Sequence, residues 1–253
     1  MRKPSDIVAI DKDAMERFLH RIAIGGVGLR LRDEDRKKAR ELVGLLPEIE
    51  RALRGRAAPL LVDAASGTGW VAIATLALLA PHARAIAIER DPKYAERARG
   101  LATAAEVTGL EVRTADAEDA AAWPDGADVV VALHACGAAT DRVIERAAAS
   151  RARTILVAPC CVASTLPLAL LAAEKAERMS LPRSGPIRRR FVESFVLGAR
   201  LWTMESLGYA TEAVAFVGET VTPYNVVLRG RRGRDGTRIE KAKRELLHLT
   251  SLA

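Results

Sequence analysis

The stretch Leu60-Leu61-Val62-Asp63-Ala64-Ala65-Ser66-Gly67-Thr68-Gly69 decides the fold of this 253-residue chain. Its apolar start predicts a short buried strand, and its glycines predict a tight turn after that strand. The Ala- and Leu-rich run from Trp70 to Leu79 predicts a helix directly after the turn. Glycines let the backbone approach a ligand closely, and a helix N-terminus favours negative groups. The stretch therefore predicts a ligand-binding strand–loop–helix unit of an α/β sheet.

The same alternation continues on the C-terminal side of this unit. Helices are predicted at 92–107 and 140–149, the first with Pro92 near its start. Further strands are predicted at 85–88, 110–114, 128–133 and 154–158. Such nearly continuous apolar strands, separated by helices, are typical of a parallel sheet that is covered on both faces.

The last two predicted strands differ from the others. A long helix at about 190–207 precedes strands at 213–217 and 226–228. Their connection is shorter than the crossover that parallel neighbours need, so they are predicted to pair antiparallel. Five parallel strands followed by an antiparallel pair resemble the fold of the class I methyltransferases. That fold is a Rossmann-like α/β fold with a seven-stranded, mostly parallel sheet and an antiparallel last strand.

Three parts are expected along the chain. Amphipathic helices at 5–22 and 33–54 predict an N-terminal helical cap, and a basic segment follows the last strand. The expected boundaries are a helical cap at 1–57, a methyltransferase domain at 58–230 and a basic C-terminal tail and helix at 231–253.

Three acidic residues occupy positions that suit S-adenosylmethionine as the cofactor. Asp63 precedes the glycine loop, where a carboxylate can meet the cationic amino group of a methionine moiety. Glu89 ends the second strand and can accept both ribose hydroxyls, and Asp116 follows the third strand, where it can accept from an adenine amino group. The remaining candidate cofactor-binding residues are Ser66, Gly67, Gly69 and Leu133. Because Gly67-x-Gly69-x-x-Ala72 also fits the dinucleotide fingerprint, NAD stays a weaker alternative.

The substrate is expected at the carboxyl ends of the fourth and fifth strands, where open α/β sheets bind their ligands. His134 is the candidate general base, because histidine can exchange a proton near neutral pH; alternatively it only shapes its loop. Cys160 is a candidate nucleophile or a small buried side chain, and Asn225 either orients the substrate or closes a turn. The side chains of His134, Cys136, Cys160 and Cys161 are of the types that bind zinc. However, adjacent cysteines lack the usual ligand spacing, so no metal is predicted.

Four motifs make a resemblance to one methyltransferase family specific. They are LHACGAATD at 133–141, PCC at 159–161, FVLGARLWTMESLGY at 195–209 and TPYN at 222–225. Over about 58–230 the chain is similar to bacterial relatives of the methyltransferase-like 25 group and of the Trm13-type tRNA 2′-O-methyltransferases. The resemblance implies cofactor binding at the acids and glycines named above, with LHACG at the substrate mouth. Two residues depart from it: Ala65 replaces the usual first glycine, and Val162 follows the two cysteines where relatives are often polar.

The net charge of +7 is concentrated in one segment. Residues 229–244 hold eight basic and two acidic residues, which accounts for six of the seven charges. This segment and Arg188-Arg189-Arg190 modestly favour RNA as the acceptor. Aromatic residues make up only 4% of the chain, which leaves few rings for stacking bases. A small-molecule or protein acceptor therefore stays open, as does a cofactor-binding interaction module without catalysis.

The expected location is the cytoplasm. The charged N-terminus lacks the apolar core of a signal peptide, and three cysteines, two of them adjacent, predict no disulfide framework. The uncharged stretch at 155–173 contains two prolines and begins like a strand. It is interpreted as a buried strand, a loop and a helix, and no membrane partner is expected.

Overall fold

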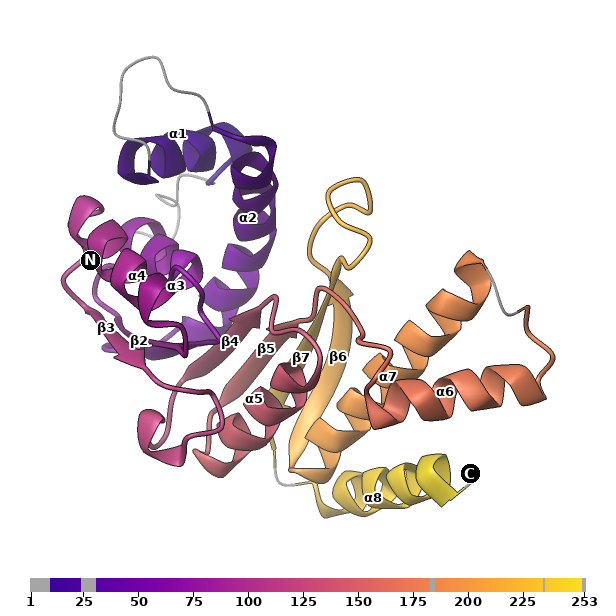
Figure 1. Ribbon diagram of the computed structural model, residues 1–253. Helices are drawn as coiled ribbons and strands as arrows, with labels where there is room; N and C mark the ends of the chain where they lie inside the picture. Colours follow the sequence, from indigo (N-terminus) through magenta and orange to yellow (C-terminus); the bar gives the residue numbers. More distant parts are fainter. Residues whose placement is uncertain (1–9, 24–30, 183–184, 234, 252–253) are drawn as a thin grey trace.

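A computed structural model describes residues 10–23, 31–182, 185–233 and 235–251. Its centre is a seven-stranded sheet (Figure 1). The strands are β1 (Leu60–Ala64), β2 (Arg84–Glu89), β3 (Leu110–Thr114), β4 (Val129–Leu133), β5 (Thr154–Ala158), β6 (Tyr209–Ala215) and β7 (Val226–Arg232). Their order across the sheet is β3-β2-β1-β4-β5-β7-β6.

The pairing confirms the predicted Rossmann-like sheet. β1 to β5 pair in parallel, whereas β7 runs antiparallel to both of its neighbours, β5 and β6. All five residues of β4 and all five of β5 are buried, as their apolar sequences predict. The predicted antiparallel last pair is therefore present, and β7 inserts between β5 and β6.

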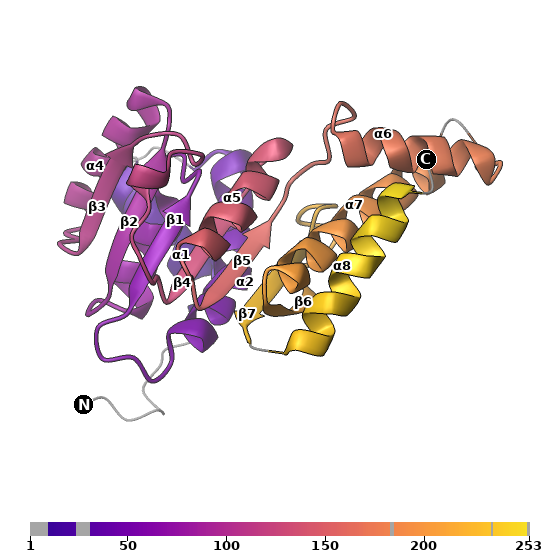
Figure 2. The same cartoon turned by 90° about the horizontal axis from the view of Figure 1, so that it is seen from below.

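Helices cover both faces of this sheet (Figures 1 and 2). The helices are α1 (Lys12–Ala23), α2 (Asp33–Leu53), α3 (Trp70–Ala74) with a π-helical turn η1 (Thr75–Leu79), α4 (Pro92–Ala104), η2 (Ala120–Ala122), α5 (Ala138–Ala149), α6 (Pro167–Arg178), α7 (Pro186–Ser206) and α8 (Gly236–Ser251).

Two hydrophobic clusters join these helices to the sheet. One joins α1, α2, α3 and α4 to residues such as Leu61, and the other joins α5 and α7 to residues such as Val62. Successive strand residues thus pack into the layers on opposite faces of the sheet.

β6 begins earlier than predicted. It spans Tyr209–Ala215 instead of 213–217. Gly208 takes a left-handed φ of 92° and ends α7 in one step. The Tyr209 side chain is then fully buried, and its hydroxyl donates a hydrogen bond to the carbonyl of Ala152 at 2.7 Å. The strand therefore starts at Tyr209, directly after this glycine.

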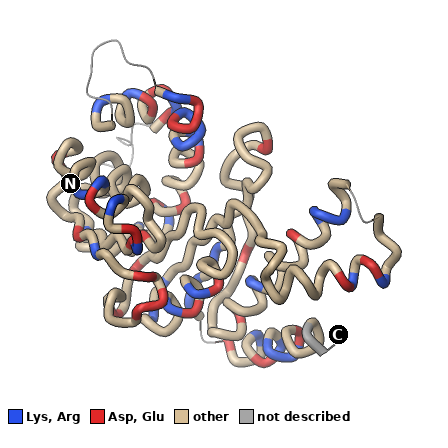
Figure 3. The backbone as a smooth tube through the Cα atoms, in the orientation of Figure 1, with Lys and Arg blue, Asp and Glu red and all other residues tan. Residues whose placement is uncertain are grey.

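The basic segment at 229–244 is not a free tail. Its first residues belong to β7, which extends to Arg232, and its later residues lie in α8, which packs on α7 (Figure 2). Arg238 pairs with Glu205 at 3.3 Å, and the Lys241 amine lies 5.6 Å from the Trp202 ring centre. Arg234 lies outside the described residues. Lys and Arg occur on α1, α2, α4 and α8 alike (Figure 3).

None of the helices in the described ranges is long and apolar enough to cross a membrane.

Candidate active site

The loop after β1 has the left-handed backbone that its sequence predicts. Gly67 and Gly69 have φ values of 57° and 73°. Ala65 also has a positive φ, 52°, at the position where the related motif carries its first glycine. A left-handed conformation costs an L-residue roughly 1–2 kcal/mol, which is the physical reason for glycine there. Ala65 thus adopts the same turn as a glycine would, at a cost in backbone strain.

Two hollows open next to this loop at the carboxyl ends of the strands. The first, of about 490 Å³, is lined by Glu89, Asp116 and the Ala138–Ala139 start of α5 among others. The second, of about 440 Å³, is lined by Asp63, Ser66, Gly67 and Leu133 among others. Ala65 and His134 line both hollows, so the two are adjacent. The structure thus brings the predicted cofactor acids and His134 to one edge of the sheet.

Asp63 is the most deeply buried of these acids, with 1% of its surface exposed. Burial raises its pKa to about 7, while the Ala72 N–H, which donates to Oδ2 at 3.1 Å, and the Lys38 charge oppose the rise. The side chain therefore gains or loses its charge near neutral pH.

Glu89 fastens the end of β2 to the glycine loop. The backbone N–H of Gly67 donates to its Oε2 at 2.7 Å, and that of Asp91 donates to Oε1 at 2.8 Å. Asp116 is more exposed and accepts a hydrogen bond from the N–H of Glu118 at 3.0 Å. In the second hollow, the Ser66 hydroxyl is buried and has no hydrogen-bond partner among the described residues.

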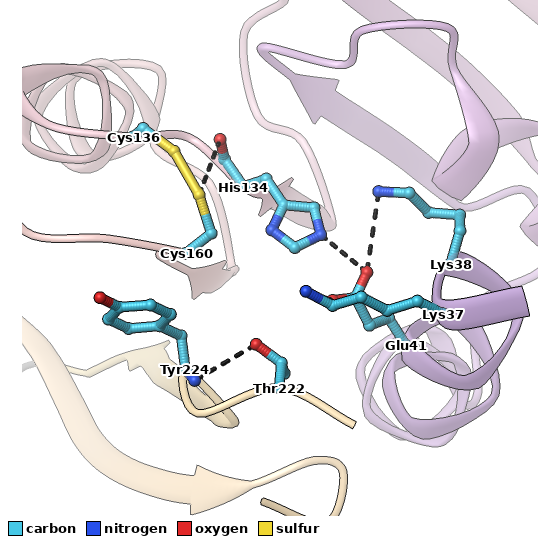
Figure 4. A network of polar contacts seen from close by, with 8 residues as sticks. All are labelled: Lys37, Lys38, Glu41, His134, Cys136, Cys160, Thr222 and Tyr224. Atoms are coloured by element: carbon cyan, nitrogen blue, oxygen red, sulfur yellow. Dashed lines mark hydrogen bonds and ion pairs between the residues drawn. A yellow bond between two sulfur atoms is a disulfide. The ribbon is translucent and has the colours of Figure 1, made fainter. Parts of the chain in front are cut away.

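His134 has a partner that the sequence did not reveal. Its Nε2 lies 2.7 Å from Oε2 of Glu41, a residue of α2 that is 1% exposed (Figure 4). Lys38 and Lys37 place their amines 3.8 and 4.0 Å from the same carboxylate. Burial alone would raise the pKa of Glu41, but the hydrogen bond with His134, the charge of that ring when it is protonated, and the charges of the two lysines lower it overall. Glu41 therefore stays ionised.

Lys38 is a second residue of the expected cap that reaches the site. It lines the same hollow as Asp63, and burial lowers the pKa of its amine against the opposing charges of Glu41 and Asp63. The only sequence signal for both residues was the charged side of an amphipathic helix. That pattern normally indicates a solvated face.

The cysteines differ from the prediction. Cys136 and Cys160 form a disulfide, whereas no disulfide was expected (Figure 4). Their Cα atoms are 6.0 Å apart because the loops after β4 and β5 lie side by side. The bonded sulfur of Cys160 is not a thiolate nucleophile in this structure. All three cysteine sulfurs lie within 4.8 Å of one another, and Cys161 is the free one.

The other predicted substrate-side residues have structural contacts. The Asn225 amide donates to the carbonyl of Val217 at 3.0 Å and so closes the β6–β7 connection, and Asn225 lines neither hollow. Arg188 donates to the carbonyl of Ala173 at 2.7 Å, and Arg189 pairs with Glu193 at 3.7 Å.

A buried arginine holds the loop that carries His134. Arg200 of α7 is 1% exposed and binds both oxygens of Asp141, at 2.7 and 3.0 Å. It also donates to the carbonyl of Gly137 at 2.8 Å. Two of the motifs quoted from the sequence, LHACGAATD and FVLGARLW, are thus joined by this one side chain.

The model of a methyltransferase domain family matches residues 37–165, which is just over half of the chain. The chain belongs to this methyltransferase family. The match begins in α2 and includes Lys38, Glu41, the glycine loop and the loops after β4 and β5. The chain is therefore a methyltransferase with the class I fold that the strand order indicates.

Solved methyltransferase structures resemble the chain only distantly. A precorrin-6y C5,15-methyltransferase from Geobacter metallireducens is 14% identical over 75% of this chain and 88% of its own, with a TM-score of 0.43. An O-methyltransferase family protein from Burkholderia thailandensis is 17% identical over 90% and 64%, with a TM-score of 0.46. An rRNA methylase from Streptococcus thermophilus is 10% identical over 75% and 95%, with a TM-score of 0.47. No curated protein sequence matches the chain.

Proposed function

We propose that this methyltransferase uses S-adenosylmethionine and transfers the methyl group to an oxygen or nitrogen atom of its acceptor. The observation that carries the proposal is the adjacency of the two hollows at Ala65 and His134. A ligand with an adenosine part and an amino-acid part, joined at a reactive sulfur, needs two such hollows with a shared wall. The reacting centre would then lie beside His134.

The lining residues fit the two parts of such a ligand. In the second hollow, Asp63 would bind the ammonium group, Lys38 the carboxylate, and the unpartnered Ser66 hydroxyl another polar atom. In the first, Glu89 keeps a lone pair on each oxygen for the ribose hydroxyls, and Asp116 would accept from the adenine amino group.

Catalysis would need alignment of the acceptor and removal of its proton. S-adenosylmethionine would supply a methyl group bound to a positively charged sulfur, and this sulfur departs as a neutral thioether, so the protein need not activate a leaving group. Because ionised Glu41 can only accept hydrogen bonds, Nε2 of His134 must donate to it, which leaves the lone pair of Nδ1 free. Nδ1 can then take the proton of the attacking oxygen or nitrogen, and Glu41 stabilises the imidazolium that forms.

For the acceptor we favour RNA, as the charge of 229–244 and the likeness to the Trm13-type tRNA methyltransferases suggest. The motifs that carry this likeness, LHACGAATD, PCC, FVLGARLWTMESLGY and TPYN, also support membership of the methyltransferase-like 25 group. Small molecules and proteins are the competing acceptors.

Calorimetry with S-adenosylmethionine, S-adenosylhomocysteine and NAD tests the cofactor. We expect binding of the first two only, and loss of that binding in Asp63→Ala. Binding of NAD without S-adenosylmethionine would overturn the proposal.

The acceptor is found by incubating the protein and radiolabelled S-adenosylmethionine with host extract separated into RNA, protein and small molecules. We expect label in the RNA fraction, reduced about 100-fold with His134→Ala. Label in the protein or small-molecule fraction would show that the acceptor belongs to that class and is not RNA. Cofactor binding without label in any fraction would favour a non-catalytic module.

A further inference from the structure

A third hollow, of about 480 Å³, lies away from the active site at the opposite edge of the sheet. Its lining comes from the end of α2, the first residue of β5, the start of β6 and the middle of β7. Arg51, at this end of α2, is ten residues from Glu41, which corresponds to about 15 Å along the helix. One helix therefore borders both the active site and this hollow.

Five arginines and two glutamates line the hollow. The glutamates are already used: Glu48 binds Arg51 and Arg229, each at 2.6 Å, and Glu212 also binds Arg229. Burial would raise the pKa of Glu48, but the two guanidinium groups lower it overall, so it stays ionised. These four residues balance one another in charge.

The other three arginines have no acidic partner among the residues that the structure describes. They are Arg54, Arg153 and Arg231. Arg153 is the most enclosed: its Nη2 donates to the carbonyl of Ala52 at 2.6 Å, but its Nε is buried without a hydrogen-bond partner in the described chain. A buried donor left unpaired costs about 1–3 kcal/mol, more when charged. The hollow therefore has three uncompensated charges and one unsatisfied donor.

We infer that this hollow binds phosphate groups. Guanidinium forks match phosphate oxygens in pairs, and an anion here would both satisfy Arg153 and offset the three charges. The phosphate can come from the backbone of an RNA or from a small free phosphate. This inference goes beyond the proposed methyl transfer and does not depend on it.

The test uses a variant that removes two of the exposed arginines, Arg54→Gln/Arg231→Gln. Its control, Arg17→Gln/Arg97→Gln, removes the same charge from α1 and α4, outside all three hollows. Two probes are used. Binding of inorganic pyrophosphate is measured by calorimetry. Binding of a labelled single-stranded oligoribonucleotide is measured by fluorescence anisotropy at several salt concentrations.

We expect the Arg54/Arg231 variant to bind at least about fivefold more weakly, and the control variant to match the wild type. If the oligoribonucleotide responds, its salt slope should fall by about 1.4, because each phosphate contact on a single strand contributes about 0.7. A response of pyrophosphate alone assigns the site to a free phosphate. No binding of either probe, or equal weakening in both variants, would overturn the inference.

Binding of S-adenosylhomocysteine is measured on the same variants. It should be unchanged in both, because neither pair of arginines lines the two active-site hollows. Loss of phosphate binding with cofactor binding intact therefore tests this site alone. Absence of cofactor binding in the wild type would instead count against the proposed methyl transfer.

Discussion

The carboxylate of Glu41 lies 2.7 Å from Nε2 of His134, although 93 residues separate the two in the chain. The contact makes α2 part of the site and sets the direction of the imidazole ring. It also leaves Nδ1 as the only ring nitrogen of His134 that can take a proton.

Substitution of His134 or Glu41 should lower turnover and leave the affinity for the cofactor unchanged. We expect His134→Ala to reduce methyl transfer about 100-fold, a usual contribution of a general base, and Glu41→Gln to reduce it about tenfold. Because Glu41 would act through His134 in the proposed mechanism, adding Glu41→Gln to His134→Ala should change little further. Single-turnover rates and S-adenosylhomocysteine affinity measure this. If His134→Ala turns over within a few fold of the wild type, His134 is not the general base.

Cofactor affinity should rise with pH through the titration of Asp63. The pKa of Asp63 is raised from an ordinary 3.8 to about 7, so the side chain is mostly neutral at pH 6 and mostly charged at pH 8. In the proposed binding mode only the charged form would attract the ammonium group, so S-adenosylhomocysteine should bind about tenfold more weakly at pH 6 than at pH 8. Calorimetry across this range measures the effect. Asp63→Asn should bind S-adenosylhomocysteine weakly and with no such pH dependence. If the affinity of this variant still depends steeply on pH, another group is responsible for the dependence.

The same raised pKa affects stability in the opposite direction. Without ligand, the fold favours the protonated carboxyl of Asp63, so this residue lowers stability as pH rises from about 4 towards 7. Denaturant unfolding of the wild type and of Asp63→Asn should therefore diverge over this range, with the variant becoming the more stable of the two. Parallel curves would contradict the raised pKa.

Ala65→Gly should leave cofactor affinity unchanged within a few fold. The alanine already has the left-handed φ of 52° that a glycine would adopt, so the loop need not move. Relief of strain is partly offset by the greater freedom of glycine in the unfolded chain, and we expect a gain below about 1 kcal/mol. Urea unfolding and calorimetry test this. A large gain in affinity would mean that the alanine distorts the site.

Arg200→Met should destabilise the protein by about 1.5–3 kcal/mol, because Asp141 is partly exposed and water can replace part of the lost interaction. The substitution leaves Asp141 and the carbonyl of Gly137 without their buried partner. Arg190→Met, an exposed substitution in the same helix, is the matched control and should cost little. Denaturant unfolding compares the two. Equal effects of both variants would show that the Arg200 pair contributes no stability.

Only one cysteine should react with iodoacetamide in the folded, unreduced protein. Cys161 is free, whereas Cys136 and Cys160 are joined. Mass spectrometry should find one label before reduction and three after reduction and unfolding. Three labels without reduction would mean that the disulfide is absent in solution.

Much of the fold was predictable because its signals are local. The run from Leu60 to Gly69 carries an apolar strand and a glycine turn, and the apolar strands that follow indicate a parallel sheet. The short connection before Val226 predicted the antiparallel pair that β7 forms. The start of β6 was misplaced because the burial of Tyr209 depends on Ala152, a distant residue.

The sequence by itself determined the parallel core, the loop after β1 and the acids that follow successive strands, because side-chain polarity and backbone preference act over a few residues. Tertiary structure alone decided which distant groups meet: Glu41 with His134, Arg200 with Asp141, Cys136 with Cys160 and Arg153 with the end of α2. Each of these pairs joins different elements of the fold. Their contact depends on how helices pack across the sheet and on which loops share its edge, which no local pattern encodes.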